Sequence, residues 1–582
     1  MSPSTSTARD ETTDPFALRE LFPVARWPRR LPLWIVVAAF GLSVGLLVYV
    51  GRGMWFLSDE WNVLLNRREL TLWEVMRPHN EHWIAFPALI YRSLLTVGHL
   101  SNYWPYYLAG LAFHTAATVT FWLLLRRLRI PRLPALLAAL SLLLMGAASE
   151  QIFNPFQLGW TAPIALFLLA LLLLDRPAPT PRHDWGAAAL LVLAMPFGGV
   201  GVALVLGIGI GFGLRREFRR IARVAGPALL AYGIWRIMWG TSPALKVEAL
   251  WLLPSYVAHG IAASTAGFTG LPLRGAAALL VLFGAAVAVA AIRTGLPLSG
   301  WAALCALLAF FAVAGIARVL EFGPTQAESS RYRYLGALLV LIVLASTIRP
   351  VRSSTGVALL AGASVLLMVC LVVNVFALRD GARFWRKLKG ESAVRIVAAD
   401  RLLADGLPHV PLAQPDPHFA PDVTAEKLLQ LREDGIPLGY GGPYELTDTA
   451  REQMRLALQA ALTPVERVTT DLRLVEGMPV AVPSGPGCAE VTAVPGQELL
   501  LDAPAGRLSL VPKEDTVLHV RRTGAAVDVA WDVTLTAGTR RQLELALPAS
   551  PDSATGLLSL GFPGGTHLTL CGRTLVDARR VR

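Results

Sequence analysis

The sequence predicts a mainly α-helical polytopic membrane protein, a bundle of about eleven spans, with a C-terminal extracytoplasmic α+β region that ends in a β-sandwich. Three observations predict this class. Hydrophobic residues make up 54% of the 582-residue chain and charged residues only 16%, whereas soluble domains carry about 25% charged residues. Apolar runs of span length recur between residues 31 and 380. The last part of the chain instead shows short alternating runs between Pro, Gly and Ser turns.

The basic residues set the expected orientation. The chain has a net charge of +12, and its arginines recur in short clusters between apolar runs, as at Arg126–Arg129, Arg215–Arg223 and Arg349–Arg352. This is the positive-inside pattern, which indicates topology and needs no nucleic-acid partner. We therefore expect a cytoplasmic N-terminus, with the polar residues 1–30 forming a disordered cytoplasmic tail.

The spans follow from the apolar runs. The stretch 186–214 is too long for one crossing and is interrupted at Pro196–Gly199, which predicts two short helices in a hairpin. Residues 250–270 fit either a crossing or an interfacial helix, and we prefer the interfacial helix because it keeps the later arginines inside. The predicted spans are 31–51, 103–125, 133–148, 159–174, the hairpin, 224–239, 274–292, 299–320, 334–348 and 356–378.

An odd number of spans places everything after residue 380 outside the membrane. Residues 381–475 show helical periodicity, and residues 476–582 show the alternation of a β-sandwich. Cys488 and Cys571 bracket the β-rich part. Because an extracytoplasmic compartment is oxidising, we expect these two cysteines to form a disulfide.

The candidate site begins in the first outer loop, directly after the first span. Asp59 and Glu60 are adjacent there, and His79, Glu81 and His82 follow in the same loop as possible metal or acceptor ligands. Charge at a membrane face costs free energy unless it is solvated, paired or bound to a ligand. A carboxylate at such a place can act as a general base or hold a divalent cation. The alternative is an ordinary polar interfacial loop with Trp anchors.

Two later segments add polar groups at the same predicted face. Glu150 lies in the second outer loop, as a possible metal or acceptor ligand or simply the end of a helix. Arg331, Tyr332 and Arg333 precede a late span, where the arginines could hold a phosphate by bidentate hydrogen bonds or anchor the helix in headgroups. A base, a possible metal ion and an anion clamp together suit displacement of a phosphate from a sugar carbon. No nucleotide-binding motif is present, so the donor is expected in the membrane, as a polyprenyl-phosphate sugar.

The layout of residues 25–380 resembles the GT-C superfamily of integral-membrane glycosyltransferases, which includes protein O-mannosyltransferases, lipid A aminoarabinose transferases and mycobacterial arabinosyl- and mannosyltransferases. The matching motif is the acidic pair in Ser58-Asp59-Glu60-Trp61, directly after the first span. The resemblance implies that Asp59 is the catalytic base, with Glu60 assisting or binding metal. It also implies a donor-phosphate role for Ser330-Arg331-Tyr332-Arg333, and a metal role for Glu150. Such an enzyme belongs in a bacterial plasma (inner) membrane.

Two alternative functions stay open on the sequence. A lipid-linked sugar flippase or transporter would carry ionisable groups deep in the bundle and pseudo-repeated halves. A surface-polysaccharide polymerase or ligase would share the chemistry but use a diphosphate-linked glycan. The expected partners are the lipid-linked donor, membrane lipids and a glycan, lipid or protein acceptor.

Overall fold

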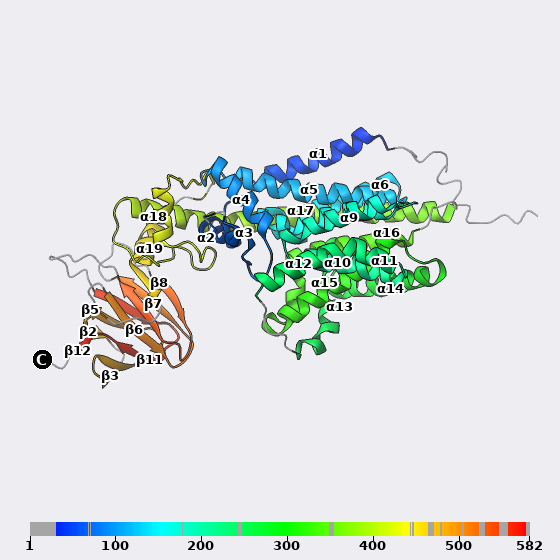
Figure 1. Ribbon diagram of the computed structural model, residues 1–582. Helices are drawn as coiled ribbons and strands as arrows, with labels where there is room; N and C mark the ends of the chain where they lie inside the picture. The colour runs from blue at the N-terminus through cyan, green and yellow to red at the C-terminus, as the bar shows by residue number, and fades with distance from the viewer. Residues whose placement is uncertain are drawn as a thin grey trace, which may run out of the picture.

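The computed structural model describes residues 31–577, except 68, 70, 177, 242–246, 349–353, 443, 445–446, 464–468, 470, 478–479, 503–505, 523–529 and 546–556. The predicted cytoplasmic tail, residues 1–30, lies outside the described residues, and so does the Arg349–Arg352 cluster. Figure 1 shows a bundle of helices that run side by side, with a smaller β-rich body beyond one end of it.

The bundle is built from the predicted apolar runs, and within the described residues seven helical stretches are long and apolar enough to cross a membrane. The outward faces of several of them are strongly apolar, as at Trp34, Leu42 and Val281. The helices that match the predicted spans are α1 (Leu33–Val50), α5 (Trp104–Arg127), α6 (Arg132–Leu143), α8 (Leu158–Leu174), α9 (Pro181–Ala194), α10 (Val200–Leu214), α12 (Gly226–Met238), α14 (Leu273–Thr294), α15 (Leu298–Phe322), α16 (Ser330–Thr347) and α17 (Ser354–Ala404).

The predicted hairpin is confirmed. Helix α9 ends at Ala194, the short turn η3 (Met195–Phe197) contains Pro196, and α10 starts at Val200. A short helix α11 (Phe218–Arg220) and a π-helical turn η4 (Ile221–Ala225) then lead into α12. Glycines let α10 approach α15 closely, since a Cβ at Gly207 would lie 2.5 Å from the Ala302 carbonyl oxygen.

The first loop folds into three short helices at the end of the bundle nearest the β-rich body (Figure 1). These are α2 (Asp59–Asn66), α3 (Leu72–Met76) and α4 (Ala85–Gly98). Trp55, Phe56 and Trp61 are fully buried here and contact one another edge to face or tilted. This aromatic cluster anchors the loop, because burying such large side chains stabilises each contact beyond its area alone. At the same end of the bundle, α6 continues into η1 (Gly146–Ala148), α7 (Ser149–Phe153) and η2 (Pro155–Gln157).

The ambiguous stretch 250–270 forms helix α13 (Ala249–Thr269). Its contacts lie near the site end of its neighbours: Tyr256 lies beside Gly315 of α15, and Ser264 lies beside Gly336 of α16. His259 pairs with Glu328 of the short turn η5 (Pro324–Glu328), which precedes α16. Thus α13 stays near one end of the bundle.

Helix α17 does not stop at the predicted domain boundary. It continues from Ser354 to Ala404, across residue 380, so the last predicted span and the first helix predicted beyond it are one element. Beyond it come α18 (Ala425–Glu433) and α19 (Asp448–Gln459). The strands begin at Ala460, earlier than the predicted start at residue 476, because α19 passes directly into the first strand.

Within the part of the chain that the structure describes, twelve strands form two sheets. One has the order β1-β9-β6-β11-β4-β3 and the other β12-β2-β5-β10-β7-β8. Buried side chains of both sheets share one core, as Leu508 and Leu568 do with Leu518 and Leu560, which gives the predicted β-sandwich. The strands are β1 (Ala460–Thr463), β2 (Asp471–Gly477), β3 (Val480–Gly485), β4 (Cys488–Ala493), β5 (Gln497–Asp502), β6 (Gly506–Pro512), β7 (Thr516–Arg522), β8 (Ala530–Leu535), β9 (Arg541–Leu545), β10 (Leu557–Phe562), β11 (Thr566–Cys571) and β12 (Thr574–Asp577).

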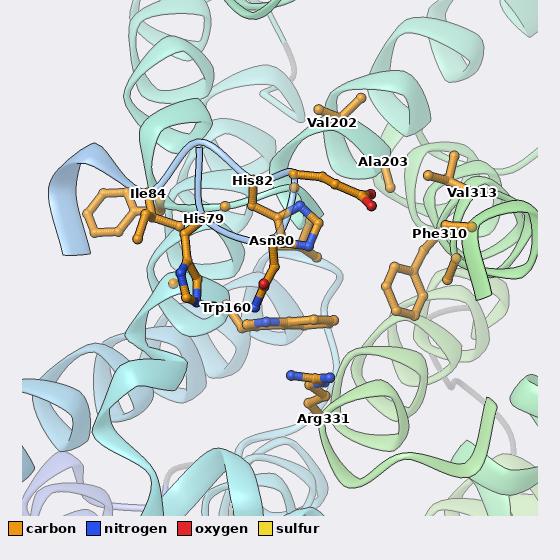
Figure 2. A pocket seen from close by; sticks show the side chains of 18 of the residues that line it. His79, Asn80, His82, Ile84, Trp160, Val202, Ala203, Phe310, Val313 and Arg331 are labelled. Carbon is orange, nitrogen blue, oxygen red and sulfur yellow. Dashed lines mark hydrogen bonds between the residues drawn. The ribbon is translucent and has the colours of Figure 1, made fainter. Parts of the chain in front are cut away.

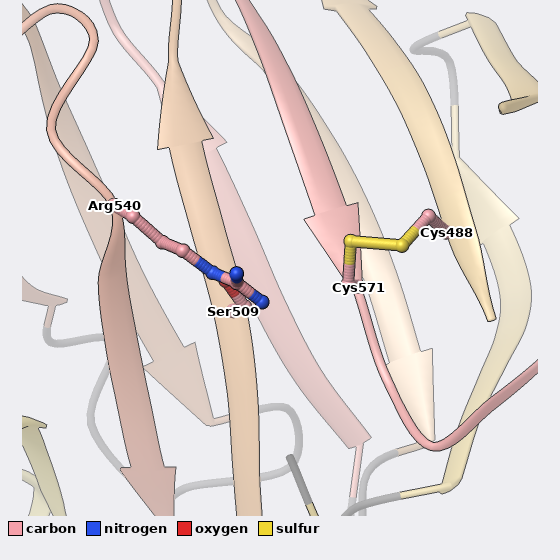
Figure 3. The surroundings of a disulfide bond; sticks show 4 residues. All are labelled: Cys488, Ser509, Arg540 and Cys571. Carbon is pink, nitrogen blue, oxygen red and sulfur yellow. A yellow bond between two sulfur atoms is a disulfide. The ribbon is translucent and has the colours of Figure 1, made fainter. Parts of the chain in front are cut away.

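The predicted disulfide between Cys488 and Cys571 is present (Figure 3). The two residues face each other across the antiparallel pair β4 and β11. The bond therefore joins neighbouring strands of one sheet, and not the first and last strands as expected from its position in the sequence.

Candidate functional site

A cavity of about 290 Å³ lies at the end of the bundle that carries the first loop. Its walls come from the turn between α3 and α4 and from α8, α10, α12, α15 and α16 (Figure 2). One wall carries the acidic and imidazole groups of the first loop, and arginines from α12, α15 and α16 line it elsewhere. Segments more than 250 residues apart in the sequence thus meet around one space.

Asp59 lines the cavity from the first turn of α2. Its Oδ1 atom lies 3.1 Å from Nε2 of His79, and its side chain is 31% exposed, against 10% for His79. Both side chains therefore line the cavity, and the carboxylate is the more exposed of the two. Burial would raise the pKa of Asp59, but the hydrogen bond and charge of His79, together with the charge of Arg331, outweigh it and lower that pKa below its ordinary value. Asp59 is thus held ionised.

The backbone around these groups is held in unusual conformations. His79 and His82 exchange two backbone hydrogen bonds of 3.0 and 2.9 Å across a tight turn whose central residues, Asn80 and Glu81, both have positive φ. Ser58, directly before Asp59, also has a positive φ of 48°. Residues other than glycine adopt a positive φ at a cost of about 1–3 kcal/mol, and residues in such strained conformations cluster at functional sites. The three residues with positive φ therefore indicate that the first loop does more than connect α1 to α5.

The His82 side chain lines the cavity beside the start of α10. A Cβ at Gly199 would lie 2.6 Å from Nδ1 of His82, so only glycine lets the imidazole take this place. Burial, with the charges of Arg318 and Arg331, lowers the pKa of His82 to about 4. The ring is therefore neutral near pH 7 and can donate or accept a hydrogen bond without adding charge.

Arg331 is the predicted cation that reaches the cavity. Its guanidinium lies below the flat face of Trp160 in Figure 2, with a distance of 5.9 Å from its central carbon to the ring. Glu150 lies behind it, 3.8 Å away, and receives a hydrogen bond from Gln157. The Nε atom of Arg331 is buried and makes no hydrogen bond within the described part of the chain. The Arg331 side chain as a whole is 32% exposed and lines the cavity, so its guanidinium can donate hydrogen bonds to an anion there.

Two further arginines line the same cavity, Arg318 on α15 and Arg236 on α12. The sequence analysis pointed to neither of them. Both lie at the end of an apolar run, where an arginine is ordinarily a headgroup anchor. The available signal was that these run ends are outer in the predicted topology, where the positive-inside rule disfavours arginine.

Arg333 does not line the cavity. Its guanidinium donates to Glu328 at 2.9 Å, and Glu328 also pairs with His259 at 2.7 Å. Tyr332 does line the cavity and stacks on Trp160 at 5.6 Å. Of the predicted phosphate-binding segment, Arg331 and Tyr332 therefore face the site, and Arg333 faces the junction between α13 and η5.

Glu60 does not line the cavity either. It is fully buried on the other side of α2 and accepts hydrogen bonds from Tyr91, Tyr103 and the backbone of Leu57. Lys389 of α17 lies 3.3 Å from it. Burial raises the pKa of Glu60, and the Lys389 charge opposes that rise. The acidic pair of the first loop is thus divided between the cavity and the protein interior.

No group of three or more His, Cys, Asp or Glu side chains is placed to hold a metal ion within the described residues. His79 is engaged by Asp59, and Glu150 lies behind Arg331. Glu81 and His82 line the cavity, but they do not converge with these groups on one point. The donors predicted for a divalent cation therefore do not form a preassembled cluster.

The remaining wall is apolar. It consists of side chains from α4, α10 and α15, among them Ile84, Val202, Ala203, Phe310 and Val313, which surround the space opposite Arg331 in Figure 2. The cavity thus combines a carboxylate, an anion-binding wall and a hydrophobic wall. Such a combination suits a ligand with an apolar part and a negatively charged part.

Comparison of the chain with protein-family models, with curated proteins and with solved structures finds no match in any of the three. The function is therefore argued from the site alone.

Proposed function

We propose that this protein is a GT-C-type membrane glycosyltransferase that moves a sugar from a polyprenyl-phosphate donor to a hydroxyl group of an extracytoplasmic glycan, lipid or protein. One observation carries the proposal: Asp59, held ionised, shares a single cavity with Arg331 and an apolar wall. These are the three chemical elements that such a transfer needs, namely a base, a site for the leaving phosphate and a surface for the lipid.

The proposed step is a displacement at the anomeric carbon. The acceptor oxygen forms a bond to that carbon while the bond from the carbon to the phosphate oxygen breaks, and the electron pair leaves with the phosphate. Asp59 takes the proton from the acceptor hydroxyl. Arg331 and Arg318 stabilise the negative charge that develops on the phosphate. Trp160 lines the cavity and offers an aromatic surface to the sugar ring, and Tyr332 stacks against Trp160 and holds it in place.

The proposed topology has about eleven spans, with the cavity and the β-sandwich on the extracytoplasmic side of a bacterial plasma membrane. The helices that match the eleven predicted spans would cross the membrane, and α13 would lie at the outer surface. Two observations support this arrangement: Tyr256, His259 and Ser264 of α13 contact their neighbours near the site end of the bundle, and the sandwich carries a disulfide, as extracytoplasmic domains do.

The test of the proposed base is Asp59→Asn in the full chain, assayed with a panel of radiolabelled polyprenyl-phosphate sugars and membrane extracts as acceptor. The substitution keeps the shape and removes the proton acceptor. We expect transfer to fall by roughly 10²- to 10⁴-fold, while the amount of folded protein recovered by size-exclusion chromatography stays the same.

Asp380→Asn is the matched control, since Asp380 lies on an exposed face of α17 with a side chain that is 76% exposed. It should transfer like the wild type. Transfer by Asp59→Asn at the wild-type rate would remove Asp59 as the base. A wild-type protein that translocates the donor across vesicle membranes without transferring its sugar would establish the flippase alternative.

A further inference from the structure

A buried ion pair connects the first loop to the C-terminal half of α17. Glu60 and Lys389 are 329 residues apart in the sequence, and both side chains are fully buried. The Lys389 ammonium donates to Glu60 at 3.3 Å and to the Tyr103 hydroxyl at 2.9 Å. The Asp59 reaction proposed above makes no use of this pair.

Burying two charges costs several kcal/mol per ion unless their remaining hydrogen-bonding capacity is satisfied. Here it is satisfied closely: Tyr91 donates to one Glu60 oxygen at 2.8 Å, and the backbone nitrogen of Leu57 donates to the other at 3.0 Å. A network of this kind is specific in geometry, and removing one partner leaves an unpaired buried charge.

The network lies directly behind Asp59. Glu60 is the next residue in the first turn of α2, and Leu57 stands on the other side of Ser58. Glu60 therefore fixes the backbone on both sides of Asp59, including the positive φ at Ser58. Because Glu60 faces the interior, its oxygens have no access to the cavity.

Helix α17 holds the same segment at a second point. Arg386 donates to the carbonyl oxygens of Val50 at 2.7 Å and of Arg52 at 2.8 Å, at the end of α1. A cation at a helix C-terminus is stabilising there. The segment between α1 and α2 is thus fixed at both ends by the helix that leads to the sandwich.

We propose that Lys389 is a positioning residue for Asp59: through its ion pair with buried Glu60 it fixes the first turn of α2, and so holds the Asp59 carboxylate in the cavity. The activity readout of this inference rests on the proposed transferase function. The structural readout does not.

The experiment compares the full-length wild type with Lys389→Met and with a matched control, Lys387→Met, in nanodiscs. Lys387 is on the same helix, but its side chain is 71% exposed. Hydrogen exchange of residues 54–66 is followed by mass spectrometry, with residues 488–501 of the sandwich as internal reference. Transfer from the polyprenyl-phosphate sugar panel is measured per folded molecule, with kcat and KM for the donor determined separately.

In Lys389→Met we expect exchange in 54–66 to rise about tenfold and kcat to fall roughly 10- to 100-fold, with the donor KM within about threefold of the wild type, because Asp59 is displaced while the anion and lipid walls are intact. Lys387→Met should match the wild type in both measurements. A purely structural role would lower the yield but leave kcat per folded molecule unchanged.

If Lys389→Met does not fold, the double variant Glu60→Gln with Lys389→Met takes its place. It carries no buried charge, and the carboxamide oxygen of the glutamine can still accept one of the hydrogen bonds that Tyr91 and the Leu57 backbone donate to Glu60. It should therefore fold with exchange in 54–66 raised less than tenfold and kcat reduced. Unchanged exchange and unchanged kcat in the variant that folds would overturn the inference. If the wild type transfers no sugar, the proposed function fails, and exchange in 54–66 alone decides the positioning role.

Discussion

At the scale of single residues, helix geometry explains why the two members of each predicted pair of charged residues face different parts of the protein. Successive residues of an α-helix are about 100° apart around its axis. Asp59 and Glu60 therefore point to different sides of α2, one to the cavity and one to Lys389. Arg331 and Arg333 are about 200° apart on α16, so only one of them can face the cavity.

The ionisation of Asp59 depends on His79. Replacing His79 with Phe removes the hydrogen bond and the charge that hold the pKa of Asp59 down, and leaves the burial that raises it. The pKa of Asp59 should rise, so a larger fraction of the carboxyl is protonated at a given pH. We expect the acid limb of the pH profile of kcat/KM to move to higher pH, with a smaller loss of transfer at high pH than Asp59→Asn causes.

The conservative variant His79→Gln, which can still donate a hydrogen bond, should move the limb less than His79→Phe does. An acid limb at the wild-type position in His79→Phe would contradict the assigned support of Asp59 by His79.

At the scale of elements, the shape of the cavity depends on where α10 and α15 pack closely and where they line the cavity instead. The two helices pack closely around Gly207 and line the cavity further along, at Val202, Ala203 and Val313. Small residues let the two helices pack tightly around Gly207, while their ends near the first loop surround a ligand-sized space.

Gly207→Ala tests this contact. Its Cβ would meet the carbonyl oxygen and Cβ of α15 residues at 2.5 Å, and backbone cannot yield as a flexible side chain can. We expect a loss of roughly 1–3 kcal/mol in the free energy of unfolding, measured by denaturation in detergent.

Gly209→Ala is the matched control two residues along α10. Its Cβ would lie 3.5 Å from Ala225, an ordinary contact, so the variant should be neutral or gain up to about 1 kcal/mol from helix propensity. Equal effects of the two substitutions would mean that helix propensity, and not the α10–α15 contact, decides the outcome.

At the scale of the whole molecule, α17 joins the helical bundle to the C-terminal region. It packs beside α6 in the bundle, holds the first loop through Lys389 and Arg386, and leads into α18 and α19 (Figure 1). The β-rich body therefore lies beyond the same end of the bundle as the cavity.

The proposed orientation predicts which engineered thiols are accessible in intact cells. Thr536→Cys, in an exposed turn of the sandwich, should react with a membrane-impermeant maleimide, and Arg182→Cys, at the start of α9, should react only after permeabilisation. The native cysteines are buried or in the disulfide. The reverse pattern would place the cavity in the cytoplasm and contradict an extracytoplasmic acceptor.

The amino-acid sequence by itself determined the apolar helices, the break at Pro196, the sandwich with its cysteine pair and the position of Asp59 after the first span. These depend on local pattern: hydrophobic runs, turn residues and alternation, which each segment expresses without its neighbours. The length of α17 was not predicted from the sequence, because the second half of this helix changes from apolar to amphipathic without a helix-ending residue.

Only the tertiary structure decided which charges meet. It brought Arg318 and Arg236 to the cavity, turned Arg333 toward Glu328, and paired Glu60 with Lys389 across 329 residues. The physical reason is that an ionic contact depends on distance in space and on the face of a helix. Helix packing sets both of these, whereas the order of residues along the chain does not.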